Sequence, residues 1–204
     1  IKDDGQLLRQ RNPDAVKRLT EALIGVGIAM AYAGNSRPAS GSEHHLSHFF
    51  EITGIINNRP YFMHGTDVAF STVYTCRMRE EILAVDIPEQ TEKFDRADWE
   101  KKIRSVYGIA ADGVIGLQDK AGVYNENKIA VYKGKWHEIR EILQDCPSAE
   151  EIVSYLCSVG LDISEFEKMY GKQKLENAKW FAKDLKDRYT VLWLYYSLFY
   201  HTKV

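Results

Sequence analysis

The stretch NPDAVKRLTEALIGVGIAMAYAG, residues 12–34, carries the signals for both ends of a helix. Asn12 is a residue type that caps helix N-termini, Pro13 is favoured in the first turn, and Gly34 is typical of a helix end. We therefore predict a helix from Pro13 to Ala33. Its apolar run is too short to span a bilayer comfortably, and its glycine and alanine content suits close packing against other helices.

The same helical period continues through most of the chain, and the fold class that we predict is an all-α helical bundle. Further helices are predicted at 42–53, 64–83, 98–107, 135–144, 147–160, 164–171 and 175–199. Ser40 or Ser42 is expected to cap the first of these. Residues 109–132 are the least regular part, and a short strand is predicted at KIAVY, residues 128–132.

The composition is that of an ordinary globular protein, with 204 residues, 45% apolar and 27% charged. The net charge of −2 gives no bias toward nucleic acid or anionic membranes, so neither is an expected partner. Three widely separated cysteines without C-x-x-C spacing favour a reducing, cytoplasmic location over a disulfide framework. The aromatic tail at 193–204 is expected to pack in the core or in a homodimer interface, because it lacks a basic face.

A histidine cluster is the strongest chemical signal. Four of the six histidines lie in RPASGSEHHLSHFFE and YFMHG, residues 37–51 and 61–65. His44 and His48 share one face of the predicted helix, and His64 begins the next helix after a loop long enough to fold back. Imidazoles that converge on a helix pair form metal sites in helical bundles. The alternative is that these are ordinary surface or core histidines.

The residues alone do not decide which reaction a metal at this cluster would catalyse. HHLSH has the outer histidines of the H-E-x-x-H pattern, but His45 replaces the glutamate that acts as general base, so a metalloprotease is disfavoured. A catalytic site generally has three protein ligands, and the third is not obvious. The carboxylates available, none with decisive spacing, are Asp14, Glu43, Glu51 and Asp67.

The stretch SRPASGSEHHLSHFFE, followed by MHG at 63–65, resembles the iron-containing alcohol dehydrogenase and dehydroquinate synthase superfamily. The match is to the bacterial sn-glycerol-1-phosphate dehydrogenases, and DRYTVLWL at 187–194 adds to it. That family has an N-terminal nicotinamide-binding domain and a helical C-terminal domain with most of the metal site. The resemblance implies that residues 1–204 are the C-terminal domain only. The N-terminal domain is expected to be absent, and a start at Ile1 suggests a fragment or a processed product.

The resemblance also implies roles for individual residues. His44 and His64 would be the two histidine ligands of the metal, and the third ligand would be an aspartate upstream of this chain. His48 would be a catalytic residue facing nicotinamide and substrate, with packing as the alternative. Glu43 would orient a metal ligand without binding the metal itself. His45 is expected to form a hydrogen bond or face solvent.

The reaction implied for the intact enzyme is reduction of dihydroxyacetone phosphate by NADH or NADPH at a divalent metal, zinc or nickel, with iron also compatible. Arg37, Ser40 and Ser42 are expected to bind the substrate phosphate, unless Arg37 pairs with a carboxylate and the serines only cap the helix. This chain alone is expected to be inactive. The alternatives are a glycerol dehydrogenase, a dehydroquinate synthase-like enzyme, and a non-enzymatic helical interaction module.

Overall fold

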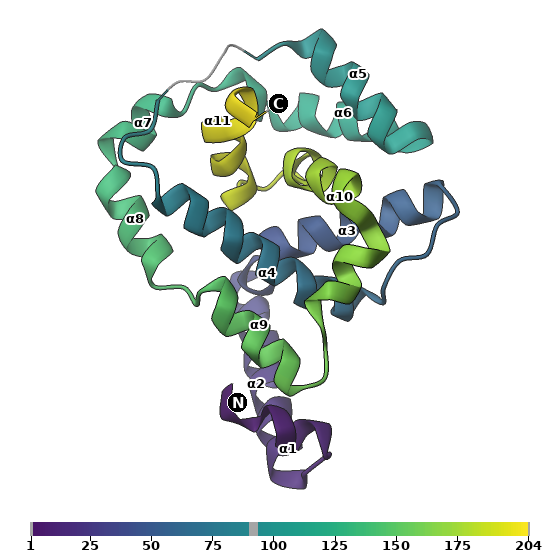
Figure 1. Cartoon of the computed structure of the whole chain (residues 1–204). Coiled ribbons are helices and arrows are strands. Elements are labelled where there is room, and N and C mark those ends of the chain that lie inside the picture. The colour runs from purple at the N-terminus through teal and green to yellow at the C-terminus, as the bar shows by residue number, and fades with distance from the viewer. Residues whose placement is uncertain (1, 90–93, 204) are drawn as a thin grey trace.

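The computed structural model describes residues 2–89 and 94–203 (Figure 1), and every regular element in these ranges is a helix. The predicted all-α fold is therefore confirmed. The α-helices are α1 (Gly5–Arg9), α2 (Pro13–Ala33), α3 (Ser42–Ile56), α4 (His64–Leu83), α5 (Arg96–Tyr107), α6 (Ala111–Ala121), α7 (Ile129–Gly134), α8 (Trp136–Gln144), α9 (Ala149–Ser158), α10 (Ile163–Phe181) and α11 (Val191–Lys203). Short 3-10 helices are η1 (Lys2–Asp4), η2 (Arg37–Ala39), η3 (Gly108–Ala110), η4 (Val123–Asn125) and η5 (Ala182–Leu185).

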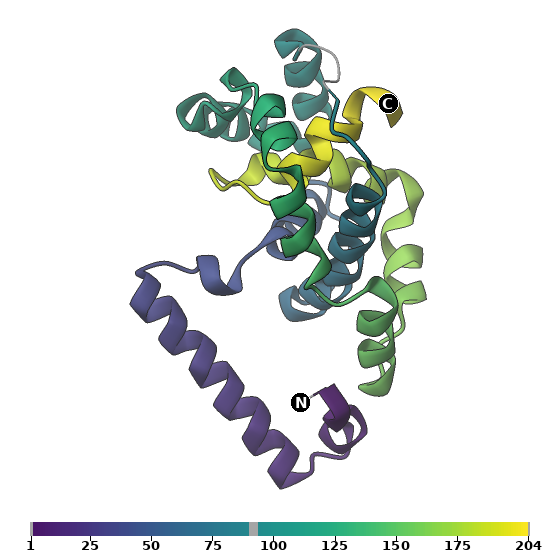
Figure 2. The ribbon, with the colours of Figure 1, turned by 90° about the vertical axis from the view of Figure 1, so that its left-hand side faces the viewer.

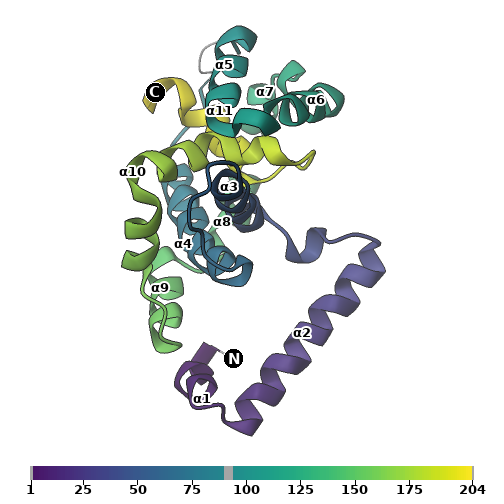
Figure 3. The same cartoon turned by 90° about the vertical axis from the view of Figure 1, so that its right-hand side faces the viewer.

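Helix α2 has the predicted bounds and the predicted caps. The Asn12 side chain accepts hydrogen bonds from the backbone N–H groups of Asp14 and Ala15, at 3.0 and 3.2 Å, and Gly34 ends the helix with a φ of 65°. Figures 2 and 3 show α2 standing away from most of the other helices, with α1 beside its N-terminal end, and its large apolar side chains, such as Leu23 and Tyr32, are exposed. Across residues 2–89 and 94–203, no helix is long and apolar enough to cross a membrane.

Helices α3 and α4 form the centre of the molecule, and they are joined by the loop that carries YFMHG (Figure 1). Helix α4 has the predicted bounds, whereas α3 continues to Ile56, past the predicted end at Thr53. The prediction that Ser40 or Ser42 caps α3 is wrong, because the N-cap residue is Gly41. Its backbone N–H donates instead to Oε1 of Glu43, at 2.7 Å.

The strand predicted at 128–132 is wrong, because helix α7 begins at Ile129. Its β-branched residues favour a strand locally, but a strand needs a neighbour to satisfy its backbone, and the described residues contain no other strand. Helix α6 was not predicted, since Gly113 and Gly116 lower its helix propensity. Burial of Val114 and Ile115 against the core compensates for this loss.

The long helix predicted at 175–199 is also wrong, because it is divided into two helices. Helix α10 ends at Phe181, and α11 begins at Val191 after η5 and a short irregular segment. A buried ion pair lies in the break, where the Lys183 Nζ is 2.8 Å from Oδ2 of Asp184. Helical periodicity does not reveal this break, because both halves carry apolar residues at similar spacing. Gly171, the predicted end of the preceding helix, has non-helical dihedral angles within α10.

An aromatic cluster joins α3, α4 and α10. The rings of Phe50 and Tyr170 are stacked at 4.1 Å, and Phe166 meets both rings edge-on at 5.1 and 5.0 Å. The ring centroid of Phe70, on α4, lies 5.2 Å from that of Phe166. Phe166 is therefore the shared contact between three helices, and it is fully buried.

The aromatic tail packs in the core, which confirms one of the two predicted positions. The side chains of Trp193, Leu194, Tyr195 and Tyr200 are buried. The tail's last residue, Val204, lies outside the described residues.

We predict that Phe166→Ala lowers the free energy of unfolding by about 3–5 kcal/mol, because it leaves a cavity between three helices. Met169→Ala, on the same helix but at a half-exposed position, is the control and should cost about 1 kcal/mol or less. Urea unfolding followed by circular dichroism measures both. Equal losses for the two variants would show that the aromatic cluster does not hold the fold together.

Candidate metal centre

The contact between α3 and α4 brings His48, Glu51 and His64 together. One ligand atom from each lies within 4.8 Å of the other two. Oε2 of Glu51 is 3.5 Å from Nδ1 of His48 and 3.8 Å from Nδ1 of His64. The ring of His64 lies between two others, with its centroid 5.0 Å from that of His48 and 5.4 Å from that of His44.

These distances fit a divalent cation. Ligand atoms around a tetrahedral zinc ion with bonds of about 2.0–2.1 Å are roughly 3.3 Å apart, and the two distances from Glu51 to the histidines, 3.5 and 3.8 Å, are near that value. Imidazole nitrogen and carboxylate oxygen are ligands that zinc, nickel and iron accept. All three side chains are partly exposed, so a small molecule has access to the cluster.

His44 is held in a defined orientation by its neighbour. Oε1 of Glu43 lies 2.8 Å from Nδ1 of His44, and Glu43 also accepts from the N–H of Gly41. A carboxylate at this position favours the tautomer with hydrogen on Nδ1, which leaves the Nε2 lone pair available. This contact supports the orienting role that the resemblance implies for Glu43.

Two members of the centre were missed by the sequence analysis. Glu51 was considered only as one of several carboxylates, although it follows His44 and His48 at the spacing of one helix face, i, i+4 and i+7. Ser47 was not considered. Its buried hydroxyl lies 3.1 Å from Nδ1 of His64 and donates to the His64 carbonyl at 3.4 Å, so it positions that ring.

The expectation for His45 is wrong. Its side chain is fully buried, and within the described part of the chain neither ring nitrogen has a hydrogen-bond partner. Burial is the main cause that lowers its pKa to about 4, and the positive charges of Lys186 and Arg188 lower it further. Burial and the charge of Lys186 also lower the pKa of His48, which favours the neutral imidazole that binds metals.

None of the remaining candidate residues belongs to the cluster of His48, Glu51 and His64 found among the described residues. Arg37 is exposed on η2, and Ser42 is buried in the first turn of α3. Ser40 lies 3.5 Å from Nζ of Lys186. Asp14 is exposed at the start of α2. Asp67 is buried, and its Oδ1 accepts a hydrogen bond of 2.6 Å from the Tyr170 hydroxyl.

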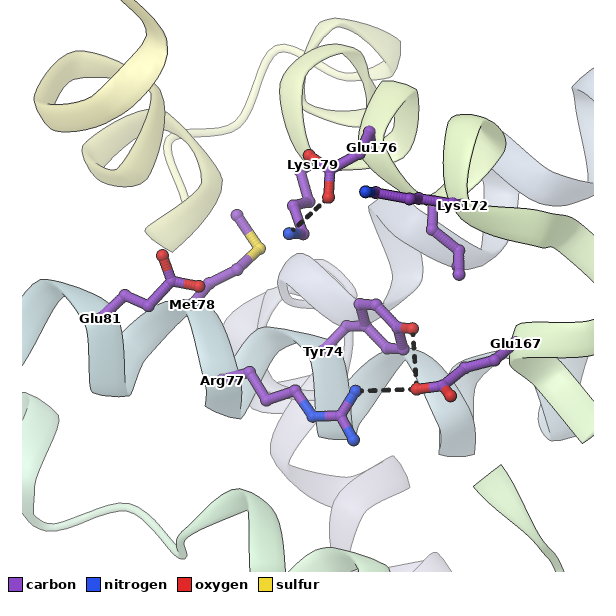
Figure 4. Close-up of a pocket in the computed structure, with 9 residues that line it drawn as sticks. Tyr74, Arg77, Met78, Glu81, Glu167, Lys172, Glu176 and Lys179 are labelled. Carbon is purple, nitrogen blue, oxygen red and sulfur yellow. Dashed lines mark hydrogen bonds and ion pairs between the residues drawn. The ribbon is translucent and has the colours of Figure 1, made fainter. Parts of the chain in front are cut away.

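A separate cavity of about 430 Å³ opens between α4 and α10 (Figure 4). Its charged groups are largely paired, since Glu167 accepts from Tyr74 and Arg77 at 3.2 and 3.1 Å. Lys179 likewise pairs with Glu176 at 2.9 Å. None of the clustered histidines lines this cavity, so it is distinct from the candidate metal centre.

The chain is similar in sequence to known enzymes. The chain is 35% identical to a glycerol-1-phosphate dehydrogenase (NAD(P)+) of Bacillus licheniformis over 100 residues, 49% of this chain and 23% of that protein. It is 26% identical to the enzyme of Geobacillus stearothermophilus over 189 residues, 91% of this chain and 39% of that protein. The enzyme of Staphylothermus marinus is 43% identical over 68 residues, 33% of this chain and 18% of that protein.

No family profile and no solved structure matches the chain. The described residues form an all-helical structure with clustered histidines, and the chain is similar over most of its length to an enzyme named as a dehydrogenase. The chain is a relative of the glycerol-1-phosphate dehydrogenases, consistent with part of their C-terminal domain, and its relatives are archaeal as well as bacterial. It spans 39% or less of the length of the relatives given above.

We predict that Asp67 makes the stability of the chain depend on pH. Burial raises the pKa of Asp67 to about 7, above the value near 3.8 in the unfolded chain. The folded state then binds more protons between these values, so stability is greatest near pH 4 and falls as pH rises to 7. Asp67→Asn keeps the acceptor for Tyr170 without the charge, and should remove this decline. Urea unfolding at several pH values measures it, and an unchanged pH slope in the variant would contradict the assignment.

Proposed function

We propose that this chain is the helical metal-binding part of an NAD(P)-dependent glycerol-1-phosphate dehydrogenase that reduces dihydroxyacetone phosphate. The observation that carries the proposal is the convergence of His44, His48, Glu51 and His64 at the α3–α4 contact. The similarity to enzymes of that name supports the reaction class.

The side chains that would hold a divalent cation form two overlapping sets. The resemblance implies His44 and His64 with a carboxylate from outside this chain, whereas the geometry favours His48, Glu51 and His64. His64 belongs to both sets. A divalent cation, zinc or nickel with iron also compatible, supplies Lewis-acid polarisation of a carbonyl oxygen.

The protein groups around the cluster prepare this chemistry. Glu43 and Ser47 orient the rings of His44 and His64, so that few rotamers have to be fixed when a ligand binds. His48 lies beside His64 on the partly exposed side, where a substrate oxygen can approach. The neutral ring of His48 can accept or donate one hydrogen bond there. Hydrogen bonding to the substrate oxygen is the catalytic role that we propose for His48.

Nicotinamide binding is proposed to depend on a part of the enzyme other than the residues described here. Dinucleotide sites of the Rossmann type are built on a strand–turn–helix unit with a glycine-rich turn. The described residues contain helices and no strand, so they offer no such unit. NADH or NADPH would then meet the substrate at an interface with another domain.

We predict that zinc or cobalt(II) binds to the purified chain and that His64→Ala weakens the binding at least tenfold, because His64 is common to both ligand sets. His137→Ala, an exposed histidine on α8, is the control and should leave the affinity unchanged. Isothermal titration measures the affinity, and the visible absorption of cobalt(II) reports the geometry. Absence of binding, or equal binding by both variants, would refute the metal centre.

The same titration separates the two ligand sets. Glu51→Gln weakens binding if the geometric set is correct, because the carboxylate charge is lost while the side chain keeps its shape. His44→Ala weakens binding if the set implied by the resemblance is correct.

We predict that the 204-residue chain alone does not oxidise NADH or NADPH in the presence of dihydroxyacetone phosphate. The reason is the absence of a strand-based dinucleotide unit among the described residues. Nicotinamide absorbance measures turnover, with His64→Ala as the background control. Turnover by the chain that disappears in this variant would show that the nicotinamide site is complete here.

A further inference from the structure

Two basic side chains from the segment between η5 and α11 reach the loop that precedes α3. Nζ of Lys186 lies 3.5 Å from Oγ of Ser40, and Nη2 of Arg188 lies 3.1 Å from Oγ of Ser36. The residues of these pairs are 146 and 152 positions apart in the sequence. The contacts therefore join the C-terminal part of the chain to the segment just before the N-terminus of α3, the helix that carries His44 and His48.

These two cations have no directly paired carboxylate in the described part of the chain, although the charge of Glu43 acts on Lys186. Neither Lys186 nor Arg188 forms an ion pair among residues 2–89 and 94–203. Glu43, the acid whose charge acts on Lys186, has an oxygen occupied by the N–H of Gly41 and by His44. Two partly buried cations without a paired carboxylate repel each other, and a bound anion would relieve that repulsion.

Other polar atoms of this segment and of α3 lack hydrogen-bond partners in the described structure. Nη1 of Arg188, Oγ1 of Thr190 and both ring nitrogens of His45 are buried without a hydrogen bond in the described structure. The His45 side chain is fully buried, and the charges of Lys186 and Arg188 act on its ring. Buried donors are rarely left unpaired, so a cluster of them indicates a ligand that completes the set.

The segment between η5 and α11, which carries Lys186 and Arg188, is held in place by α6. Nε2 of Gln118, a buried side chain of α6, donates to the carbonyl oxygens of Asp184 and Lys186 at 2.8 and 3.1 Å. The buried pair between Lys183 and Asp184 fixes the preceding turn. Such anchoring reduces the entropy that is lost when the cations bind a ligand.

We propose that Lys186 and Arg188, together with the hydroxyls of Ser36 and Ser40, form the site that binds the phosphate group of a small phosphorylated substrate. The guanidinium fork of Arg188 matches phosphate oxygens, and Lys186 adds a point charge. The site lies at the N-terminal end of α3, whose first two turns carry His44 and His48, and the charge of Lys186 acts on the His48 ring. The identity of that substrate rests on the proposed function, whereas the phosphate site rests on these contacts.

This assignment differs from the one that the resemblance implies. Arg37 is exposed on η2, and no hydrogen bond or ion pair joins its side chain to Lys186 or Arg188 among the described residues. Ser40 belongs to both assignments, because Lys186 contacts it. The new members, Lys186 and Arg188, come from the segment that contains DRYT, residues 187–190.

The test is binding of inorganic phosphate to the purified chain in the presence of a chelator, followed by phosphorus NMR. Lys186→Gln and Arg188→Gln should each weaken binding by about tenfold or more, because a charge-assisted hydrogen bond is lost. Lys133→Gln, an exposed lysine on α7, is the matched control and should bind like the unchanged chain. Glycerol 1-phosphate should displace inorganic phosphate, and glycerol should not. Circular dichroism checks that every variant is folded.

The inference is overturned if the unchanged chain binds no phosphate, or if both variants bind it as tightly as the control. Zinc titration of the same samples keeps the two proposals separate. Phosphate binding that depends on Lys186, in a chain that binds no zinc, supports the phosphate site and refutes the metal centre. Zinc binding by a chain that binds no phosphate supports the metal centre and refutes the phosphate site.

Discussion

The packing of α3 against α4 is the contact on which the candidate site depends. Phe50 of α3 is held against α10 by Phe166 and Tyr170, and Phe70 of α4 meets the same cluster. This packing buries one side of α3 and leaves His44, His48 and Glu51 on the partly exposed side. His64 is then brought to them because it begins the neighbouring helix. The chemistry of the site is thus positioned by apolar contacts that take no part in it.

Two charged regions meet at the N-terminal half of α3. The histidines and Glu51 supply neutral nitrogen and anionic oxygen, which suit a cation, whereas Lys186 and Arg188 supply positive charge, which suits an anion. The two groups come from different elements, the histidines and Glu51 from α3 and α4 and the two cations from the segment between η5 and α11. Glu43 lies between the two regions and is occupied by Gly41 and His44. It orients the His44 ring, and its charge acts on Lys186.

Much of the helical fold could be predicted because its signals are local. Asn12, Pro13 and Gly34 act on the backbone within a few residues, and the observed bounds of α2 follow from them. The His44–His48 pair and the return of the chain at His64 were likewise visible in the spacing. The errors fall where a distant contact overrules local preference. Burial stabilises the glycine-containing α6, the pair of Lys183 and Asp184 interrupts the last long helix, and KIAVY has no strand to pair with.

The sequence by itself determined the helical class, the bounds of α2 and α4, and the candidate ligand types. Each of these is set by residues within a turn or two of one another. Only the tertiary structure decided that Glu51 faces His64, that His45 is buried, and that Lys186 lies beside Ser40. These relations join positions that are distant along the chain, and their free energy comes from packing and charge in the folded state. A pattern read along the sequence contains no term for either.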